Sequence, residues 1–167
     1  MPDMLVNLGK IDFDHFSYDL LVSERVRIVR ALAPDRLRIF SFIETNIPTH
    51  WPQESSDSWI GECEAAMSNN PPSCFLAVRD NLIVGFACYN ATGKGYFGPT
   101  GVLVQEQGKQ IGKALLMKSL SSLWNEGFGY AIIGWPAKKA MGFYEKTVNA
   151  QVIENSSPGI YSRMIDS

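Results

Sequence analysis

The pattern of apolar and polar residues along the chain predicts alternating strands and helices. Short apolar runs bounded by turn residues predict strands at 74–78, 82–89, 96–104 and 130–135. The dipeptide Asp80-Asn81 separates the first two runs and is typical of a hairpin turn. A helical pattern lies between the last two runs, and a strand, a helix and a second strand in this order form a parallel crossover. The pattern therefore predicts both antiparallel and parallel strand pairs.

Four segments carry apolar residues at helical spacing. Pro34 and Asp35 mark the start of the first segment, and Pro48 is expected to end it, because the residue before a proline disfavours helical geometry. The last segment covers roughly residues 137–147. The apolar positions are Ile39, Ile43 and Ile47; Trp59, Cys63, Ala66 and Met67; Leu116, Leu120, Leu123 and Trp124; and Ala140, Phe143, Tyr144 and Val148. Each set predicts an amphipathic helix.

The junction at residues 102–116 carries the strongest functional signal. The apolar run Val102–Val104 enters a polar turn with two glycines, and the turn opens the third helix. The first N–H groups of a helix have no partner within it and lie at the positive end of its dipole. Glycines let a phosphate approach this backbone, and Lys109 and Lys113 add positive charge. The junction therefore predicts a site for a phosphorylated ligand.

Two common nucleotide motifs do not fit this junction. A P-loop requires G-x-x-x-x-G-K-[ST], but Gly108 and Gly112-Lys113 are one residue too close, and Ala114 stands where a hydroxyl must reach magnesium. The dinucleotide fingerprint G-x-G-x-x-G is absent as well. An NTPase is therefore disfavoured, and a plain strand-to-helix turn remains an alternative to a ligand site.

The loop resembles the acyl-CoA loop of the GNAT superfamily of N-acetyltransferases, [QR]-x-x-G-x-[GA]. Gln107 and Gly112 match its ends, and Gln110 stands where the family usually has glycine. Residues 140–150 are similar to a second family segment, A-x-x-x-[FL]-Y-x-K-x-G-[AF], in which Tyr144 matches the tyrosine. The two segments occur in the family's order, and the likeness covers roughly residues 22–165.

This resemblance implies an α/β (α+β) fold with a mixed, mostly antiparallel central sheet and helices on both faces. It also implies a splayed parallel strand pair, and Phe97–Gly101, with one proline and two glycines, is where we expect the break. We expect a single domain over residues 1–167. Residues 1–21 are left unassigned, as an added strand, a helix or an arm on a partner.

The resemblance further implies that acetyl-CoA is the co-substrate and that Tyr144 is the general acid that protonates the departing thiolate. Many family members carry asparagine where this chain has Ala137, so a family contact with CoA is not expected there. Backbone groups of the preceding strand would bind pantetheine and polarise the thioester carbonyl. The implied cofactor-binding residues are Val102, Leu103, Val104, Gln107, Gly108, Lys109, Gln110, Ile111, Gly112, Lys113 and Ala114.

The front half of the chain is expected to build the acceptor site, as it does in the family. His50 and Trp51 are candidates for contact with an acceptor, and an exposed loop with an aromatic anchor is the alternative. Glu44, Glu62 and Glu64 are candidates for the general base, and a solvated helix face is the alternative for each.

The predicted function is transfer of an acetyl group from acetyl-CoA to a primary amine by direct attack. A polyamine, an aminoglycoside-like compound, an amino acid and a protein N-terminus are all candidate acceptors. The alternative is a non-catalytic acyl-CoA-binding sensor or regulatory module, which the departures at Gln110 and Ala137 keep open.

Charge and composition exclude several other classes of partner. The net charge is −2 and the pI about 5.7, which gives no reason to expect nucleic acid or an anionic membrane surface. No apolar run approaches the roughly 20 residues of a membrane-spanning helix. A homodimer is a further expectation, since relatives in the family often form dimers.

Cysteine use predicts a reducing compartment and a cytoplasmic location, because the chain has only three cysteines, Cys63, Cys74 and Cys88. No C-x-x-C or Cys/His motif is present, so we expect no metal site. If the hairpin turns at Asp80-Asn81, Cys74 and Cys88 point to opposite faces of the sheet, and a disulfide between them is not expected.

Overall fold

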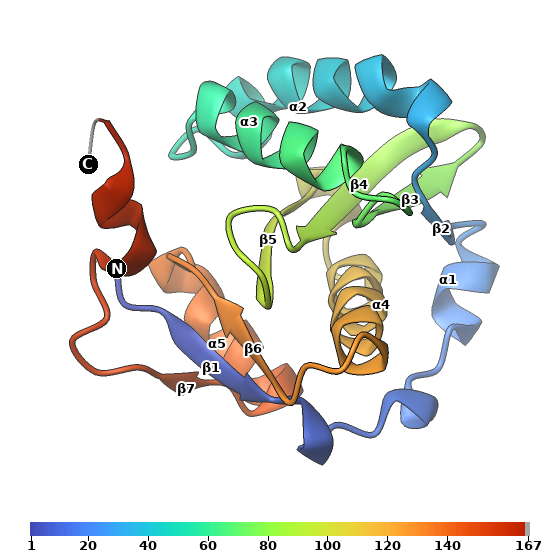
Figure 1. The fold of residues 1–167 in the computed structure, drawn as a ribbon. Helices are drawn as coiled ribbons and strands as arrows, with labels where there is room; N and C mark the ends of the chain where they lie inside the picture. Colours follow the sequence, from blue (N-terminus) through green and yellow to red (C-terminus); the bar gives the residue numbers. More distant parts are fainter. Residues whose placement is uncertain (166–167) are drawn as a thin grey trace.

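The computed structural model describes residues 1–165, which form one seven-stranded sheet in the order β2-β3-β4-β5-β6-β1-β7 (Figure 1). Strands β5 and β6 pair in parallel, and the other neighbours are antiparallel. This confirms the mixed, mostly antiparallel sheet. The strands are β1 (Met4–Asn7), β2 (Arg27–Arg30), β3 (Cys74–Arg79), β4 (Leu82–Tyr89), β5 (Tyr96–Val102), β6 (Tyr130–Ile133) and β7 (Gln151–Val152).

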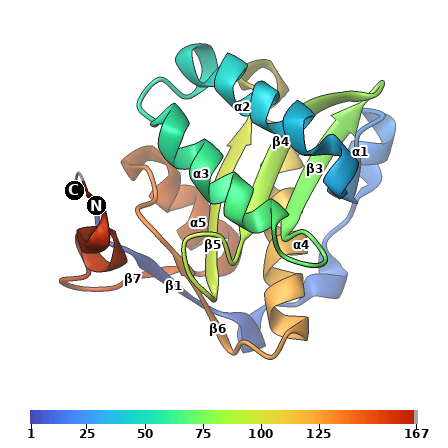
Figure 2. The ribbon, with the colours of Figure 1, turned by 45° about the horizontal axis from the view of Figure 1, so that its top comes forward.

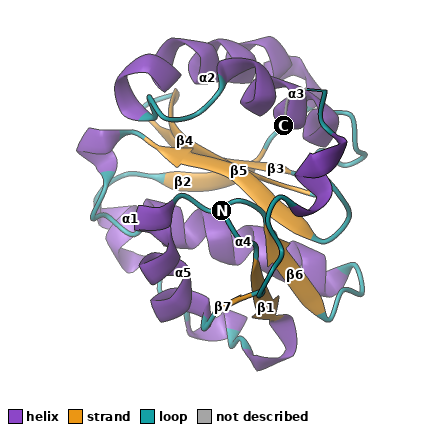
Figure 3. Ribbon diagram, turned by 90° about the vertical axis from the view of Figure 1, so that its left-hand side faces the viewer, coloured by secondary structure: helices purple, strands orange, loops and turns teal. Residues whose placement is uncertain are grey.

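Helices cover both faces of the sheet, as expected (Figure 3). Helices α2 (Arg36–His50) and α3 (Ser56–Met67) lie on one face, and α1 (Asp19–Ser23), α4 (Ile111–Asn125) and α5 (Met141–Val148) lie on the other. Each side has its own core. Ile39, Ile43 and Ile47 of α2 are buried on the first side, whereas Leu116 and Leu120 of α4 are buried on the second. Within the described residues, no helix is long and apolar enough to span a membrane.

Helix α2 does not end at Pro48, contrary to the sequence prediction. It continues to His50, and the N–H of Trp51 donates to the carbonyl of Ile47 at 2.9 Å. Pro48 lies in the last turn, so the missing N–H removes one helical hydrogen bond without breaking the remaining turn. The last predicted helix is also shorter than expected, because Lys138–Ala140 form a 3₁₀ turn and α5 begins at Met141.

The unassigned N-terminal segment forms an added strand next to the edge of the sheet. Strand β1 lies between β6 and β7 and pairs antiparallel with both. Asp3 is buried beside it, and its Oδ1 accepts a hydrogen bond from the N–H of Trp135 at 3.1 Å. The N–H of Asp3 donates to Ser156 Oγ at 2.7 Å. The N-terminal segment therefore fixes the loop after β6 and the segment after β7.

A β-bulge places Cys74 directly opposite Cys88, so the predicted placement on opposite faces is wrong. A regular hairpin on Asp80-Asn81 pairs Val78 with Ile83, as observed, but the next pair is Ala77 with Gly85. One extra residue on β4 therefore changes the register of every pair that follows. The two cysteines come onto the same face, and all three cysteines are free thiols.

Candidate functional site

A cavity of about 1410 Å³ opens where β5 separates from β6. The two strands pair only at Tyr96 with Ile132 and at Phe97 with Ile133, and then diverge (Figure 2). Residues 97–102 of β5 line the gap, and Pro99, which cannot donate to a ladder, lies within it. The splayed parallel pair is therefore present at the predicted break. The cavity walls also include the start of α4, the helix α5, the α2–α3 connection and the C-terminal turn at 159–163.

The first turn of α4 forms one end of the cavity. Most of the predicted loop residues line it: Gln107, Gly108, Gln110, Ile111, Gly112 and Lys113. A Cβ built on Gly112 would meet only Val102 Cγ2, at 3.8 Å, so the backbone is open toward the cavity. The N-terminus of a 15-residue helix therefore points its free N–H groups and positive dipole end into the cavity.

Gln110 adopts the left-handed conformation at the N-cap of α4, with φ 69° and ψ 9°. The right-handed geometry that would suit glutamine without strain is therefore not the one that this residue adopts. Glycine is the residue that adopts left-handed geometry without cost, and an L-residue pays roughly 1–2 kcal/mol for it. This explains in physical terms why glycine suits this position, and it means that Gln110 is held in a strained conformation.

Lys109 does not line the cavity. Its Nζ lies 3.3 Å from Glu106 Oε2 and 3.5 Å from Glu24 Oε2, and Arg79 forms a close ion pair with Glu106. The hydrogen bond from Arg79 lowers the pKa of Glu106, and Lys109 acts in the same direction. Of the two lysines predicted to face a phosphate, only Lys113 lines the cavity. Lys109 instead fixes the loop through this ion-pair network.

Two of the three backbone N–H groups at Val102–Val104 already have partners. The N–H of Leu103 donates to the carbonyl of Val84 at 3.1 Å, and the N–H of Val104 donates to His50 Nδ1 at 3.0 Å. Backbone groups of neighbouring residues in a strand point to opposite sides. The N–H of Val102 therefore points away from β4 and into the gap. Val102 is the one of the three best placed to contact a thioester.

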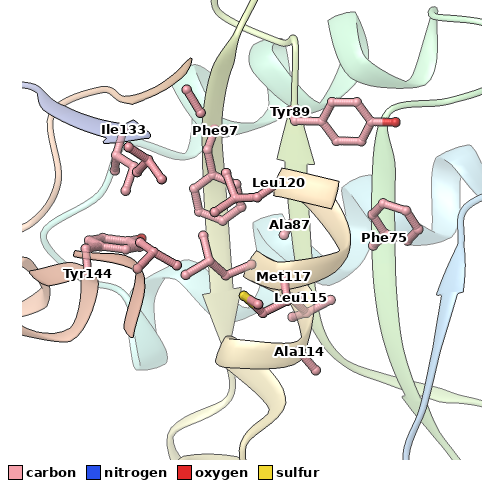
Figure 4. Close-up of a cluster of buried hydrophobic side chains, with 14 of the residues drawn as sticks. Phe75, Ala87, Tyr89, Phe97, Ala114, Leu115, Met117, Leu120, Ile133 and Tyr144 are labelled. Carbon is pink, nitrogen blue, oxygen red and sulfur yellow. The ribbon is translucent and has the colours of Figure 1, made fainter. Parts of the chain in front are cut away.

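Tyr144 reaches the cavity from α5 and is largely buried. Its ring lies edge-on to Phe97 of β5, with 6.3 Å between the ring centroids. Ile133 of β6 lies on the same side of Phe97 as Tyr144 (Figure 4). Burial raises the pKa of the Tyr144 hydroxyl, and the charge of Glu54 raises it further. The hydroxyl is therefore protonated at neutral pH, although its raised pKa makes it a weaker acid than an exposed tyrosine. Ala137, where many GNAT proteins have asparagine, also lines the cavity.

Another part of the cavity wall carries carboxylates and aromatic rings. Burial raises the pKa of Glu54, which hydrogen bonds with Trp59. Burial also raises the pKa of Glu62, whose carboxylate accepts a hydrogen bond from Thr92 Oγ1. The charge of Glu54 also raises the pKa of both Tyr144 and Glu62, so Glu54 lies near enough to act on both side chains.

Sequence reasoning found some of these residues and missed others. His50, Trp51 and Glu62 line the cavity, whereas Glu64 is exposed and pairs with Arg36. Glu54 was missed because it lies in a loop with no periodic pattern. The C-terminal turn was missed too. Its Tyr161 stacks on Trp135, with 4.2 Å between the ring centroids, and both residues line the cavity. No short motif in the sequence marks either feature.

Comparison with known proteins agrees with this geometry. Residues 36–149 match the acetyltransferase (GNAT) family. The glucosamine N-acetyltransferase region of a fungal multi-domain β-N-acetylglucosaminidase is 11% identical, with TM-score 0.67 over 91% of this chain and 19% of that one. This chain therefore spans about a fifth of the fungal protein. A GNAT family acetyltransferase from Brucella melitensis, in complex with acetyl-CoA, is 19% identical, with TM-score 0.54 over 77% of this chain and 86% of that one.

A third similar structure is an aminoglycoside acetyltransferase from an uncultured soil metagenomic sample, in complex with trehalose. It is 18% identical, with TM-score 0.54 over 75% of this chain and 89% of that one. No match was found among the curated proteins. At these identities the structural likeness concerns the fold, whereas the family match covers more than half of the chain. The protein therefore belongs to the GNAT family of acetyltransferases.

Proposed function

We propose that this protein transfers an acetyl group from acetyl-CoA to a primary amine by direct attack. One observation carries the proposal: a single cavity joins the N-terminus of α4, the gap between β5 and β6, and the buried hydroxyl of Tyr144. An anion site, a slot for an extended thioester arm and a proton donor are the three parts that this reaction needs.

The acetyl-CoA end of the proposed site follows from the start of α4. The pyrophosphate would lie against the N–H groups around Gly112, with Lys113 beside it. The pantetheine arm would extend through the gap toward Val102, whose N–H is directed at the thioester carbonyl. A preorganised backbone donor of this kind contributes about 3 kcal/mol to stabilising an oxyanion.

The acceptor end of the proposed site needs a base, and Glu54 fits this role. A primary amine with a pKa of about 10 is protonated at neutral pH and must lose a proton before it attacks. The raised pKa of Glu54 makes its carboxylate a better proton acceptor than an exposed glutamate. The amine nitrogen then bonds to the thioester carbon and loses its extra proton to solvent. The carbon–sulfur bond breaks, and Tyr144 protonates the departing CoA sulfur and regains a proton from solvent.

The same end favours a cationic acceptor. Glu54 and Glu62 attract an ammonium group, and the rings of Trp51, Trp135 and Tyr161 offer apolar faces beside them. The similar structures described as glucosamine and aminoglycoside acetyltransferases point toward amino sugars as the first class to test. A homodimer and a cytoplasmic location remain predictions from the sequence.

The test is an acceptor screen that follows release of the free CoA thiol from acetyl-CoA. Amino sugars, polyamines, amino acids and peptides with a free N-terminus form the panel. We expect acceptor-dependent thiol release together with an acceptor whose mass increases by one acetyl group. Tight acetyl-CoA binding without release for any acceptor would support the alternative, a non-catalytic acyl-CoA sensor.

A further inference from the structure

The three cysteines of the chain meet at one point inside the fold. Cys63 comes from α3, Cys74 from β3 and Cys88 from β4, and their sulfur atoms all lie within 4.8 Å of one another. The chain has no other cysteine. The β-bulge creates this arrangement, because without it Cys88 would point to the opposite face. Three separate elements thus bring every thiol of the protein together.

The surroundings of this thiol cluster are apolar. Each of the three side chains is 0% exposed, and the cluster belongs to the core beneath α2 and α3. The neighbours in this core include Ile43, Leu76 and Phe86. The thiols do not line the cavity of the proposed acetyl-transfer site. They are therefore a separate feature that the proposed reaction does not use.

Charge decides which ion such a cluster can hold. A structural zinc site needs four ligands, and among the described residues only these three sulfur atoms form a potential metal-binding group. A divalent ion with three thiolates carries a net negative charge, which is costly to bury without a compensating partner. A trivalent ion with three thiolates is neutral and suits an apolar core.

We propose that Cys63, Cys74 and Cys88 form a buried trithiol site that binds trivalent arsenic as a neutral trithiolate. Arsenous acid, As(OH)₃, reacts with the three thiols. Three As–O bonds and three S–H bonds break, three As–S bonds form, and three water molecules leave. Arsenic stays trivalent, so the step needs no oxidant or reductant.

Local opening of α3 gives access to the site, because α3 is the outer layer above the two strands that carry Cys74 and Cys88. Uptake should therefore be slow and limited by opening, and arsenic should be well retained once all three bonds have formed.

The experiment is incubation of the folded, reduced protein with arsenite, followed by desalting and elemental analysis. We expect one arsenic per chain and the loss of three thiols per bound arsenic in a thiol count on the wild-type protein. Each of Cys63→Ala, Cys74→Ala and Cys88→Ala should weaken retention by more than the roughly 10–100-fold typical of losing an outer partner of a metal site. Met67→Leu changes the same core, keeps all three thiols and should bind like the wild type.

Three results would overturn the proposal. The first is absence of retained arsenic, and the second is a loss of only one or two thiols per arsenic in the wild-type protein. The third is preferential retention of Zn²⁺ from an equimolar mixture, since it contradicts the charge argument. The thiol count uses the wild-type protein alone, so it decides the question even if a cysteine variant fails to fold.

Discussion

Gly101 of β5 lies directly against the indole ring of Trp51. A Cβ built on Gly101 would come within 2.6 Å of Trp51 Cζ2, closer than real Cβ contacts allow. Trp51 in turn packs on Trp59, with 5.3 Å between ring centroids, and on Phe86. This contact joins β5, which lines the cavity, to the connection between α2 and α3.

Gly101→Ala should therefore destabilise the protein. The added methyl group must displace a buried indole, and overpacking of this kind costs about 1–3 kcal/mol. Urea unfolding measures the change in the free energy of unfolding. Gly61→Ala is the matched control, because nothing lies within 4 Å of a Cβ there. It lies inside α3 and should stabilise the protein by up to about 1 kcal/mol. Equal effects of the two substitutions would contradict the contact.

Gln110→Gly should raise the free energy of unfolding by up to about 1 kcal/mol, because glycine relieves the left-handed strain and only part of this gain is lost to chain entropy. Gln110→Val should lower it, since a β-branched residue is worse in this geometry. Acetyl-CoA affinity should change by less than about tenfold, or 1.4 kcal/mol, in the glycine variant. Equal stability of all three proteins in urea unfolding would rule out left-handed geometry at this residue.

Gly112→Asp should abolish acetyl-CoA binding in calorimetric titration while the fold is kept. The space at Gly112 accepts a Cβ, but the carboxylate would lie where the pyrophosphate is proposed to bind. Gly112→Ala is the control for size, and it should bind acetyl-CoA nearly as well as the wild type. Unchanged affinity in the aspartate variant would mean that the phosphates bind elsewhere.

Glu54→Gln should reduce kcat by about 10²–10⁴-fold, the usual contribution of a general base. Because burial raises the pKa of Glu54, the acidic limb of the wild-type pH–rate profile should lie above the ordinary glutamate pKa of about 4.3. This limb should disappear in the variant. Glu64→Gln on the exposed side of α3 should leave both kcat and the limb unchanged.

The raised pKa also sets the sign of the effect on stability. A glutamate whose pKa is raised by folding contributes stability below its unfolded pKa and loses it as the pH rises through the folded pKa. The ionised carboxylate of Glu54 thus opposes folding at neutral pH, and Glu54→Gln should not lower the free energy of unfolding there. A large loss of stability would mean that Glu54 has a structural role.

The sequence predicts the fold well because each element has its own local signal. The apolar runs that become β3 to β6 and the helical stripe of α4 are visible in the chain alone. The bulge in β4 has only a weak local signal, the isolated Gly85 within the strand, and one extra residue moves Cys88 to the other face. Register depends on distant contacts and is therefore harder to predict than the existence of a strand.

In the candidate site too, residues that belong to a local motif were predicted, and residues that depend on distant contacts were not. The loop before α4 and Tyr144 were found from local motifs, whereas the ion pairs of Lys109 depend on Glu24 and Arg79, far away in the chain. Glu54 and Tyr161 likewise become part of the cavity only when the α2–α3 connection and the C-terminal turn come together. The position of β1 between β6 and β7 depends on pairing with β6 across most of the sequence.

The most direct test of the proposed acetyl transfer is kcat of the wild-type protein and of Tyr144→Phe with the best acceptor from the screen. The phenylalanine keeps the packing against Phe97 but removes the proton that the thiolate needs. We predict acceptor-dependent release of CoA by the wild type and a kcat lower by about 10²–10⁴-fold in the variant, with acetyl-CoA affinity nearly unchanged. Equal kcat values for the two proteins, or no turnover by the wild type with any acceptor, would contradict the account.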